Sequence, residues 1–261
     1  MLRKLDLAEA VARSSESREA AWEFVSDFTE VWLDSALRRG DGYPESDIGA
    51  AEEKLATPLP RTLKDALIKF GRRSDLVRNQ ERLLAPWELR FDETGEVLIF
   101  RVENQGAAEW GIPVDRLRDE DPATVYRLST ADRESSRWVP WISCLSLAFV
   151  ELILWESLFA GSPSLRLQLP FRSENKGSLE SGFRRLDLPD FPDTSIIVSY
   201  GFTVRWYAGE GAILCLFDVP GSENDDYDPW TMADGGGGEL FIRARTHEAM
   251  HAARLLCGVG K

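Results

Sequence analysis

The spacing of apolar residues in the first part of the chain is that of an amphipathic helix. From residue 17 onward, apolar side chains recur at intervals of three or four residues, which places them on one helix face. They are Ala21, Val25, Phe28, Trp32 and Ala36. Ser17 precedes this stripe and is a suitable N-cap, and the glycines and proline of residues 40–44 are typical helix breakers. The pattern therefore predicts one helix from Ser17 to about residue 39.

Two shorter helices are predicted next. Asp47 is the expected N-cap of the first, and Pro60 is expected to begin the second, where its missing N–H costs little. The residues expected to face inward are Ile48, Ala51 and Leu55 in the first helix and Leu63, Ala66, Leu67 and Phe70 in the second. Gly71 is a natural residue to end the second helix.

The hydrophobic period then changes to that of strands. Residues 97–102 are largely apolar on both faces, which predicts a buried central strand, and a second short strand carries Trp110 and Ile112. Residues 138–141 indicate an edge strand, because Pro140 cannot donate a ladder hydrogen bond. Ser143 is the expected N-cap of a long helix that runs to Gly161.

The last hundred residues predict a hairpin, one more strand and a terminal helix. Residues 196–207 and 212–217 flank a glycine-containing turn, and residues 239–245 and 248–257 give the later strand and helix. Helices followed by a sheet with packed helices indicate an α+β fold. We expect N-terminal helices on a mixed, mainly antiparallel sheet over residues 1–160. We expect residues 161–261 to be a C-terminal extension continuous with that domain.

Composition places the chain among globular proteins. It has 261 residues, 43% hydrophobic, and can bury enough surface to fold without a disulfide or metal. Its three cysteines, Cys144, Cys215 and Cys257, are scattered, and we expect them to be reduced and buried. No signal-peptide pattern or long apolar run occurs, so we expect a cytoplasmic protein with no membrane partner.

The formal net charge of −13 narrows the choice of partner. An acidic chain repels the phosphates of nucleic acids and of anionic lipids, and it attracts basic proteins. We therefore expect no nucleic-acid partner and favour a protein partner. The alternative is that the acidic surface only keeps the protein soluble.

One short motif suggests a zinc enzyme. His247, Glu248 and His251 match the H-E-x-x-H pattern, in which two histidines bind zinc and the glutamate acts as general base. A catalytic zinc needs a third protein ligand, and none follows His251 at a suitable distance. Thr246 is instead a good N-cap for a terminal helix. We therefore expect no metal, no cofactor and no catalytic residues, and keep a zinc hydrolase as the least favoured alternative.

Two further motifs do not predict a ligand site. Asn224, Asp226 and Asp228 have the spacing of a calcium loop, but Pro229 stands where the sharp turn requires glycine. The four glycines at residues 235–238 are followed by a strand pattern and have acidic neighbours, so a phosphate site is not expected there.

An acidic segment near the C-terminus is the predicted contact with a partner. It combines negative charge with two aromatic side chains, a composition suited to a basic protein surface. Its residues are Glu223, Asp225, Asp226, Tyr227, Asp228 and Trp230. The alternative is a solvated loop whose Trp230 packs back onto the sheet.

The order of several short motifs between residues 43 and 160 resembles the SUKH superfamily, the family of the yeast cell-wall-assembly regulator and of bacterial toxin-immunity proteins. The resemblance rests on residues 48–55, a Leu-Pro pair, a Phe-Gly pair, the turn of residues 103–106 and a Trp-Gly pair. The motif residues to which we assign structural roles are Leu59, Pro60, Asn104, Gln105, Gly106 and Trp110. Asn104 and Gln105 either fix their turn by hydrogen bonds to backbone groups or line a groove, and the turn role is favoured. Ala56 departs from the pattern, where glycine is common.

The resemblance implies an α+β fold and, for bacterial members, an immunity protein that binds and neutralises a cognate toxin, often a nuclease. It implies no transferable site residues, because the binding surfaces of the family vary with the toxin. A regulatory scaffold that binds endogenous cytosolic proteins, as the yeast relatives do, is the alternative from the same family.

Overall fold

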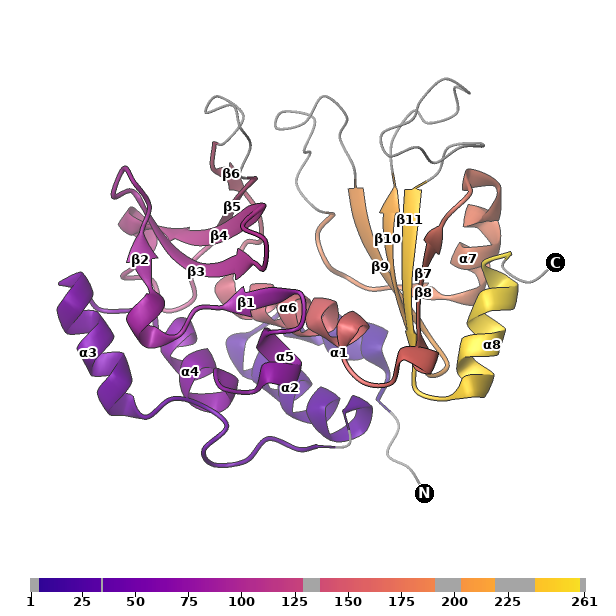
Figure 1. Cartoon of the computed structure of the whole chain (residues 1–261), viewed down its shortest axis with the longest axis horizontal. Helices are drawn as coiled ribbons and strands as arrows, with labels where there is room; N and C mark the ends of the chain where they lie inside the picture. The colour runs from indigo at the N-terminus through magenta and orange to yellow at the C-terminus, as the bar shows by residue number, and fades with distance from the viewer. Residues whose placement is uncertain (1–4, 34, 129–136, 191–202, 219–237, 259–261) are drawn as a thin grey trace. The chain divides into compact units, whose positions relative to one another are not determined.

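The computed structural model of the chain describes residues 5–33, 35–128, 137–190, 203–218 and 238–258 (Figure 1). The chain divides into two compact units. The first comprises Met1–Leu5 and Arg13–Ala160, and the second comprises Asp6–Ala12 and Gly161–Lys261. Helix α1 (Leu7–Ser14) is therefore shared between them.

The first unit consists of helices on one face of an antiparallel sheet. Its helices are α2 (Arg18–Trp32), α3 (Glu45–Leu55), α4 (Arg61–Phe70), α5 (Ser74–Val77), α6 (Leu145–Phe159) and the 3-10 turns η1 (Pro86–Glu88) and η2 (Val114–Arg116). Its strands are β1 (Glu81–Leu83), β2 (Arg90–Phe91), β3 (Val97–Glu103), β4 (Ala108–Pro113), β5 (Val125–Leu128) and β6 (Val139–Pro140). The α+β fold class predicted from the sequence is confirmed.

Helix α2 follows the predicted stripe as far as Trp32. The Ser17 hydroxyl caps it, accepting a hydrogen bond from the Ala20 N–H at 3.1 Å. The predicted extension to Ala36 is wrong. The N–H groups of Leu33 and Ser35 both donate to the Thr29 carbonyl, so the chain turns there, and Ala36 is exposed.

Helices α3 and α4 begin at prolines. Pro44 is the N-cap of α3, so the prediction of Asp47 as its cap is wrong, and Asp47 instead lies in the first turn. Pro60 is the N-cap of α4, and Gly71 ends α4 with an ordinary φ of −58°. Gly71 is needed for another reason: a Cβ there would lie 2.7 Å from the Leu67 carbonyl oxygen and 2.9 Å from the Tyr43 ring.

The strand order in the first sheet is β1-β3-β4-β5-β6, with β2 also paired to β3, and every pairing among the described strands is antiparallel. The sheet is thus antiparallel rather than mixed. As predicted, β3 is a buried central strand, and β6, which contains Pro140, lies at an edge. Because β6 lies at the edge of the sheet, the missing N–H of Pro140 costs the sheet no hydrogen bond.

A β-bulge in β3 changes which side chains face the helices. Ile99 pairs with Gly111 and Arg101 with Trp110, so Phe100 is an extra residue. Simple alternation predicts opposite faces for Phe100 and Arg101. Both instead reach α6, Phe100 through the ring of Phe149 and Arg101 through a carboxylate. The bulge has re-aimed Arg101 to the inner face of the sheet.

Helix α6 is the centre of the first unit and is buried on nearly every side. Cys144, not Ser143, is its N-cap, so the predicted cap is wrong. The side chain that caps the helix comes from Asp121, 25 residues before Ser146. Asp121 accepts hydrogen bonds from the Ser146 N–H at 2.8 Å and from its hydroxyl at 2.6 Å. The ring of Phe149 contacts aromatic rings of three other elements, namely Trp22, Phe70 and Phe100.

The second unit has a sheet and core of its own. Its elements are η3 (Pro163–Leu165), β7 (Arg166–Pro170), η4 (Ser173–Asn175), α7 (Lys176–Gly182), β8 (Arg184–Arg185), β9 (Thr203–Gly209), β10 (Ala212–Asp218), β11 (Gly238–Ala244) and α8 (His247–Leu256). The strand order is β7-β11-β10-β9-β8, all antiparallel. The predicted hairpin is confirmed for β9 and β10, and residues 196–202 of its first predicted strand lie outside the described residues. The strand that follows and the terminal helix are confirmed.

The expectation that residues 161–261 continue the first sheet is wrong for the described strands. These strands pair with one another, and one face of their sheet packs against α7 and α8. The core includes Leu214, Leu240 and Ile242 from the sheet and Leu179 and Met250 from the helices. Burying such side chains stabilises a fold by roughly 1.5–3 kcal/mol each, so the segment holds the apolar residues of a separate core.

Two expectations about the whole chain were tested in part. Among the described residues, no helix is both long and apolar enough to cross a lipid bilayer. All three cysteines are free thiols: Cys215 and Cys257 are buried as expected, whereas Cys144 is half-buried at the start of α6.

The end of α3 yields a prediction about stability. Ala56 adopts φ 52° and ψ 31°, a left-handed conformation that favours glycine. We expect Ala56→Gly to raise the free energy of unfolding by roughly 0.5–1 kcal/mol, measured from the urea midpoint.

The matched control is Ala50→Gly, at an exposed position inside the same helix. There glycine adds backbone entropy to the unfolded chain without relieving strain, so the free energy of unfolding should fall by a similar amount. Loss of stability in both variants would show that Ala56 carries no strain.

Candidate functional site

The inner face of the first sheet holds a buried charged cluster. The side chain of Arg101 is fully buried, and its guanidinium pairs with the Glu81 carboxylate and, at 2.7 Å, with Glu151. Its Cζ atom lies 4.2 Å from the ring centroid of Trp110 and 5.2 Å from that of Trp141. One cation thus connects β1, β3, β4 and α6.

A third buried carboxylate adjoins the cluster. Glu156 on α6 accepts hydrogen bonds from the backbone N–H groups of Asn79, Gln80 and Glu81, including one of 2.7 Å from Glu81. These bonds tie the segment that enters β1 to α6. Three buried carboxyl groups therefore lie in or beside the cluster, and one guanidinium is there to balance their charge when they ionise.

Burial raises the pKa of these carboxyl groups. Desolvation, partly offset by Arg101, raises the pKa of Glu81 to about 8 from an ordinary value of 4.5. Desolvation also raises the pKa of Glu151, and it raises that of Glu156 to about 6 against the effect of its backbone hydrogen bonds. Because the cluster is buried, we assign it to the support of the fold.

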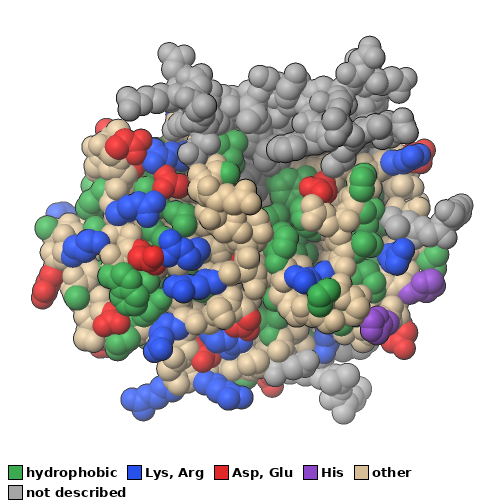
Figure 2. All heavy atoms as spheres, viewed as in Figure 1, with side chains coloured by type: hydrophobic (Ala, Val, Ile, Leu, Met, Phe, Trp, Pro, Cys, Tyr) green, Lys and Arg blue, Asp and Glu red, His purple; other side chains and the backbone are tan. Residues whose placement is uncertain are grey.

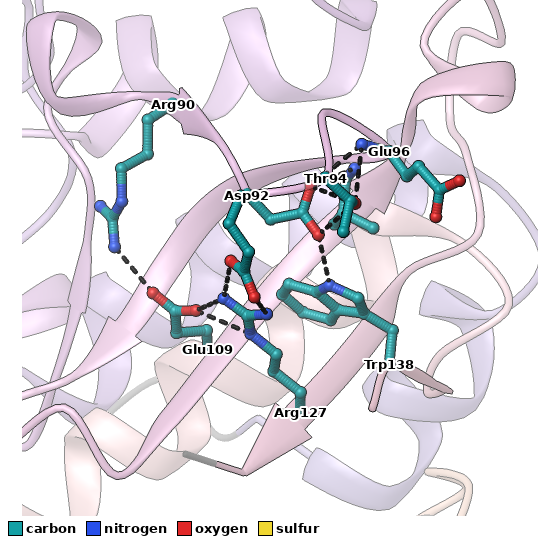
Figure 3. Close-up of polar contacts among 9 residues, drawn as sticks. Arg90, Asp92, Thr94, Glu96, Glu109, Arg127 and Trp138 are labelled. Atoms are coloured by element: carbon teal, nitrogen blue, oxygen red, sulfur yellow. Dashed lines mark hydrogen bonds and ion pairs between the residues drawn. The ribbon is translucent and has the colours of Figure 1, made fainter. Parts of the chain in front are cut away.

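The outer face of the same sheet carries an assembled set of polar side chains, which we call the outer-face site (Figure 3). It consists of Arg90, Asp92, Glu93, Glu109, Arg127 and Trp138. Glu109 on β4 and Arg127 on β5 are cross-strand partners. Arg127 donates to Glu109 at 2.6 Å and 2.9 Å, and Arg90 on β2 donates to it at 2.7 Å.

The side chain of Arg127 is held by Glu93, Glu109 and Trp138. Its two terminal nitrogens donate to both oxygens of Glu93 at 2.7 Å and 3.0 Å, a bidentate pair, and these bonds raise its pKa further. Its Cζ atom lies 4.6 Å from the ring centroid of Trp138. Figure 3 shows the guanidinium between Glu109 and the indole. This stacking and pairing hold a long side chain in one rotamer.

Asp92 connects the site to the β2–β3 turn. Its carboxylate accepts hydrogen bonds from the Trp138 indole N–H at 3.0 Å, from the N–H groups of Glu96 and Val97, and from the Thr94 hydroxyl. Burial raises the pKa of Asp92, but these hydrogen bonds outweigh burial and hold the pKa below its ordinary value of 3.8. The charged carboxylate thus orients Trp138.

A glycine makes room for the indole. A Cβ atom at Gly111 would overlap the Val97 side chain and would lie 3.3 Å from the ring of Trp138. Gly111 therefore lets Trp138 lie close to the sheet, beside Arg127. The Trp-Gly pair singled out in the sequence thus contributes Trp110 to the inner face and Gly111 to the outer one.

The outer-face site combines paired charges with an ordered indole. Its acidic groups are held by arginines or hydrogen-bond donors, and its two arginines and one tryptophan are residue types enriched at protein-binding hot spots. Within the described ranges, no group of three or more His, Cys, Asp or Glu side chains is placed to hold a metal ion.

The structure places some of the residues predicted from the sequence. His247 and His251 are exposed on α8, and Thr246 caps that helix by accepting from the Ala249 N–H at 3.1 Å. The acidic segment of Glu223, Asp225, Asp226, Tyr227, Asp228 and Trp230, the calcium-like spacing and residues 235–237 of the glycine run lie outside the described residues. The predicted partner contact of that segment stays a prediction.

The residues of the short sequence motifs between residues 43 and 160 lie in the core or in a turn. Leu59 is buried and its N–H donates to Glu52 at 2.8 Å. Asn104 and Gln105 are exposed in the β3–β4 turn, where Gly106 has a φ of 78°. The carboxylate that accepts backbone hydrogen bonds in this turn is that of Glu103, from Gln105 at 2.7 Å and Ala107 at 3.1 Å.

Sequence reasoning did not find the outer-face site. Its members are spread over nearly fifty residues, and no spacing connects Arg90, Glu109 and Arg127. A weak signal existed: Glu109 and Arg127 are isolated charges in otherwise apolar strand patterns, where each must find a partner. Locating that partner requires the strand register.

Comparison with known proteins gave no matching family model, no matching curated protein and no matching solved structure. The resemblance to the SUKH superfamily therefore stays an interpretation of the sequence motifs.

The buried cluster predicts how stability depends on pH. The folded protein keeps a proton on Glu81 between pH 4.5 and about 8, whereas the unfolded chain loses it. That stabilisation is complete below pH 4.5 and is lost as the pH rises through 8. Between pH 7 and 8, above the pKa of about 6 of Glu156, the free energy of unfolding should fall by roughly 1 kcal/mol per pH unit.

Glu81→Gln, which mimics the protonated carboxyl, should flatten this dependence in urea titrations at several pH values. Glu53→Gln, an exposed change on α3, should leave the wild-type slope unchanged. An equal slope in Glu81→Gln and the wild type would show that Glu81 is ionised in the folded protein.

Proposed function

We propose that this protein is a non-catalytic protein-binding module, an immunity protein that binds and neutralises a cognate toxin domain. The observation that carries the proposal is the outer-face site, in which Arg127 and Trp138 are stacked at 4.6 Å and held by surrounding carboxylates. Side chains ordered in advance lose little conformational entropy on binding, so their contacts contribute more of their energy to affinity.

The position of the site suits contact with a folded partner. Arg90 is about half exposed, with 46% of its side chain accessible, and Glu93 is more exposed at 69%. The more enclosed Arg127 and Trp138 lie inside this charged rim. A partly buried Arg–Trp centre with a polar rim is the usual arrangement of a protein interface.

The charge of the chain supports a basic partner. At −13, it attracts a basic domain over a distance and accelerates the encounter. Nuclease toxins bind anionic substrates with basic surfaces, which fits this preference. The acidic segment from Glu223 to Trp230 is the predicted second contact. A regulatory scaffold for endogenous proteins would use the same outer-face site with a different partner.

Co-expression tests the proposal. The neighbouring reading frame is expressed alone and together with this protein, and growth and co-purification are measured. We expect toxicity that this protein relieves, with a stable one-to-one complex. A harmless neighbour that forms no complex would reject the immunity function, and stable complexes with endogenous proteins instead would identify the scaffold alternative.

The outer-face site makes a sharper prediction for that complex. Trp138→Ala removes the indole that orders Arg127, and Arg90→Ala removes an exposed rim charge. We expect Trp138→Ala to weaken the affinity at least about tenfold and Arg90→Ala to weaken it less, because central anchors dominate interface energies.

Leu255→Ala, an exposed change on α8, is the control and should bind as the wild type does. Circular dichroism identifies any variant that has failed to fold. A folded Trp138→Ala variant with wild-type affinity would exclude the outer-face site from the interface.

A further inference from the structure

The two histidines of the chain lie about one helical turn apart on α8. They are His247 and His251, and the chain contains no other histidine. Both are exposed, and Figure 2 shows both imidazoles, coloured purple, on the face viewed. Within the part of the chain that the structure describes, no hydrogen bond or ion pair holds either ring. The ring nitrogens are therefore available to a ligand from solvent.

The helix that carries the histidines is fixed at its start and along its buried side. Thr246 caps α8 by accepting from the Ala249 N–H at 3.1 Å, and its carbonyl oxygen accepts from the Met250 N–H at 3.0 Å. Met250 and Ala253 hold the helix in the core of the second unit. In regular helix, residues i and i+4 have Cβ atoms roughly 5–6 Å apart on one face. Both imidazoles can therefore reach one ion held between them.

A pair of imidazoles at this spacing binds divalent transition-metal ions. Imidazole nitrogen suits Zn²⁺, Cu²⁺ and Ni²⁺, whereas Mg²⁺ and Ca²⁺ prefer oxygen ligands. The H-E-x-x-H motif places its two metal-binding histidines at the same spacing on one helix face. An ion bound by the first imidazole is held close to the second, which raises the affinity above that of a single imidazole. The exposed histidine pair thus offers a two-ligand chelate.

The pair lacks the third protein ligand of a catalytic zinc. Among the residues that the structure describes, no group of three or more His, Cys, Asp or Glu side chains is placed to hold a metal ion. Glu248 lies about 100° around the helix from His247, because successive residues are rotated by that angle. Two histidines leave the other coordination positions to water, so the arrangement suits binding of an ion at the surface.

The charges near the pair act in both directions on a cation. The partial positive charge at the start of the helix opposes binding, as does Arg254 in its last turn. Glu248 in the first turn offsets the helix dipole, and the net charge of −13 attracts cations to the chain. Such contributions are small at exposed positions, so the imidazole ligands decide the affinity.

We propose that His247 and His251 form a surface site for one divalent transition-metal ion, bound by both imidazoles. The proposal revises the expectation from the sequence that the two histidines hold no metal. That expectation rested on the missing third ligand of a catalytic centre, which a two-ligand site does not need. The inference goes beyond the proposed function, because it concerns α8 and requires neither the outer-face site nor a toxin.

A zinc titration followed by NMR tests the site. The full-length chain, purified without a polyhistidine tag, is isotopically labelled at its histidines, so only two imidazoles give signals. We expect the signals of both imidazoles to change together as Zn²⁺ is added, up to one ion per chain. We expect Mg²⁺ to leave them unchanged. Isothermal titration calorimetry then gives the affinity for Zn²⁺.

Three variants, all at exposed positions, locate the binding. We expect His251→Ala to bind Zn²⁺ at least about tenfold more weakly, because a single imidazole remains. The matched control combines His251→Ala with Ala252→His. It keeps two histidines but places them about 140° apart around the helix, so it should bind as weakly as His251→Ala. Glu248→Gln should bind as the wild type does. Circular dichroism checks that each variant folds.

Two results would overturn the inference: imidazole signals that do not respond to Zn²⁺, or equal Zn²⁺ affinity in the wild type and both histidine variants. Zinc held elsewhere on this acidic chain would give the second result, because it would persist in the variants. The outcome is independent of the co-expression experiment. If both proposals hold, His251→Ala loses zinc binding and still relieves the toxicity of the partner.

Discussion

The buried guanidinium of Arg101 is the interaction on which the first unit depends. It pairs with carboxylates from β1 and α6 and lies over the ring of Trp110 on β4, so one side chain joins four elements. Removing a buried charge from such a set leaves its partners uncompensated, which typically costs 3–5 kcal/mol. The arrangement also favours the observed sheet register, because a one-residue slip would turn Arg101 away from both carboxylates.

The bulge at Phe100 separates the two faces of this sheet. It directs Arg101 toward α6 and leaves Glu109 and Arg127, one pair further along the ladder, on the outer face. Buried charges on the inner face therefore make the strands rigid, and the outer face holds Arg127 and Trp138 on that rigid support. Binding groups mounted on a sheet are positioned more accurately than groups on loops. The buried charges that support the fold and the outer-face site thus lie on opposite faces of the same strands.

Charge is distributed unevenly along this acidic chain. Residues 61–90 contain eight Lys or Arg and four Asp or Glu, whereas the segment from Glu223 to Trp230 is acidic and is the predicted contact with a basic partner. Complementary charge at such a contact contributes to specificity and to the rate of encounter. In the proposed outer-face site, Trp138 is ordered by a hydrogen bond to Asp92 and by its contact with Arg127.

The sequence by itself determined the fold class and most of the longer helices and strands. Helical stripes, the Ser17 and Thr246 caps, the buried strand at β3 and the β9–β10 hairpin are local patterns, because each depends on residues a few positions apart. Tertiary structure decided the rest. The Asp121 cap of α6, the inward turn of Arg101, the separate second sheet and the meeting of Arg90, Glu109, Arg127 and Trp138 all depend on strand register and on contacts between distant residues. Hydrophobic periodicity carries no information about which strands pair, so no local pattern could have assembled that site.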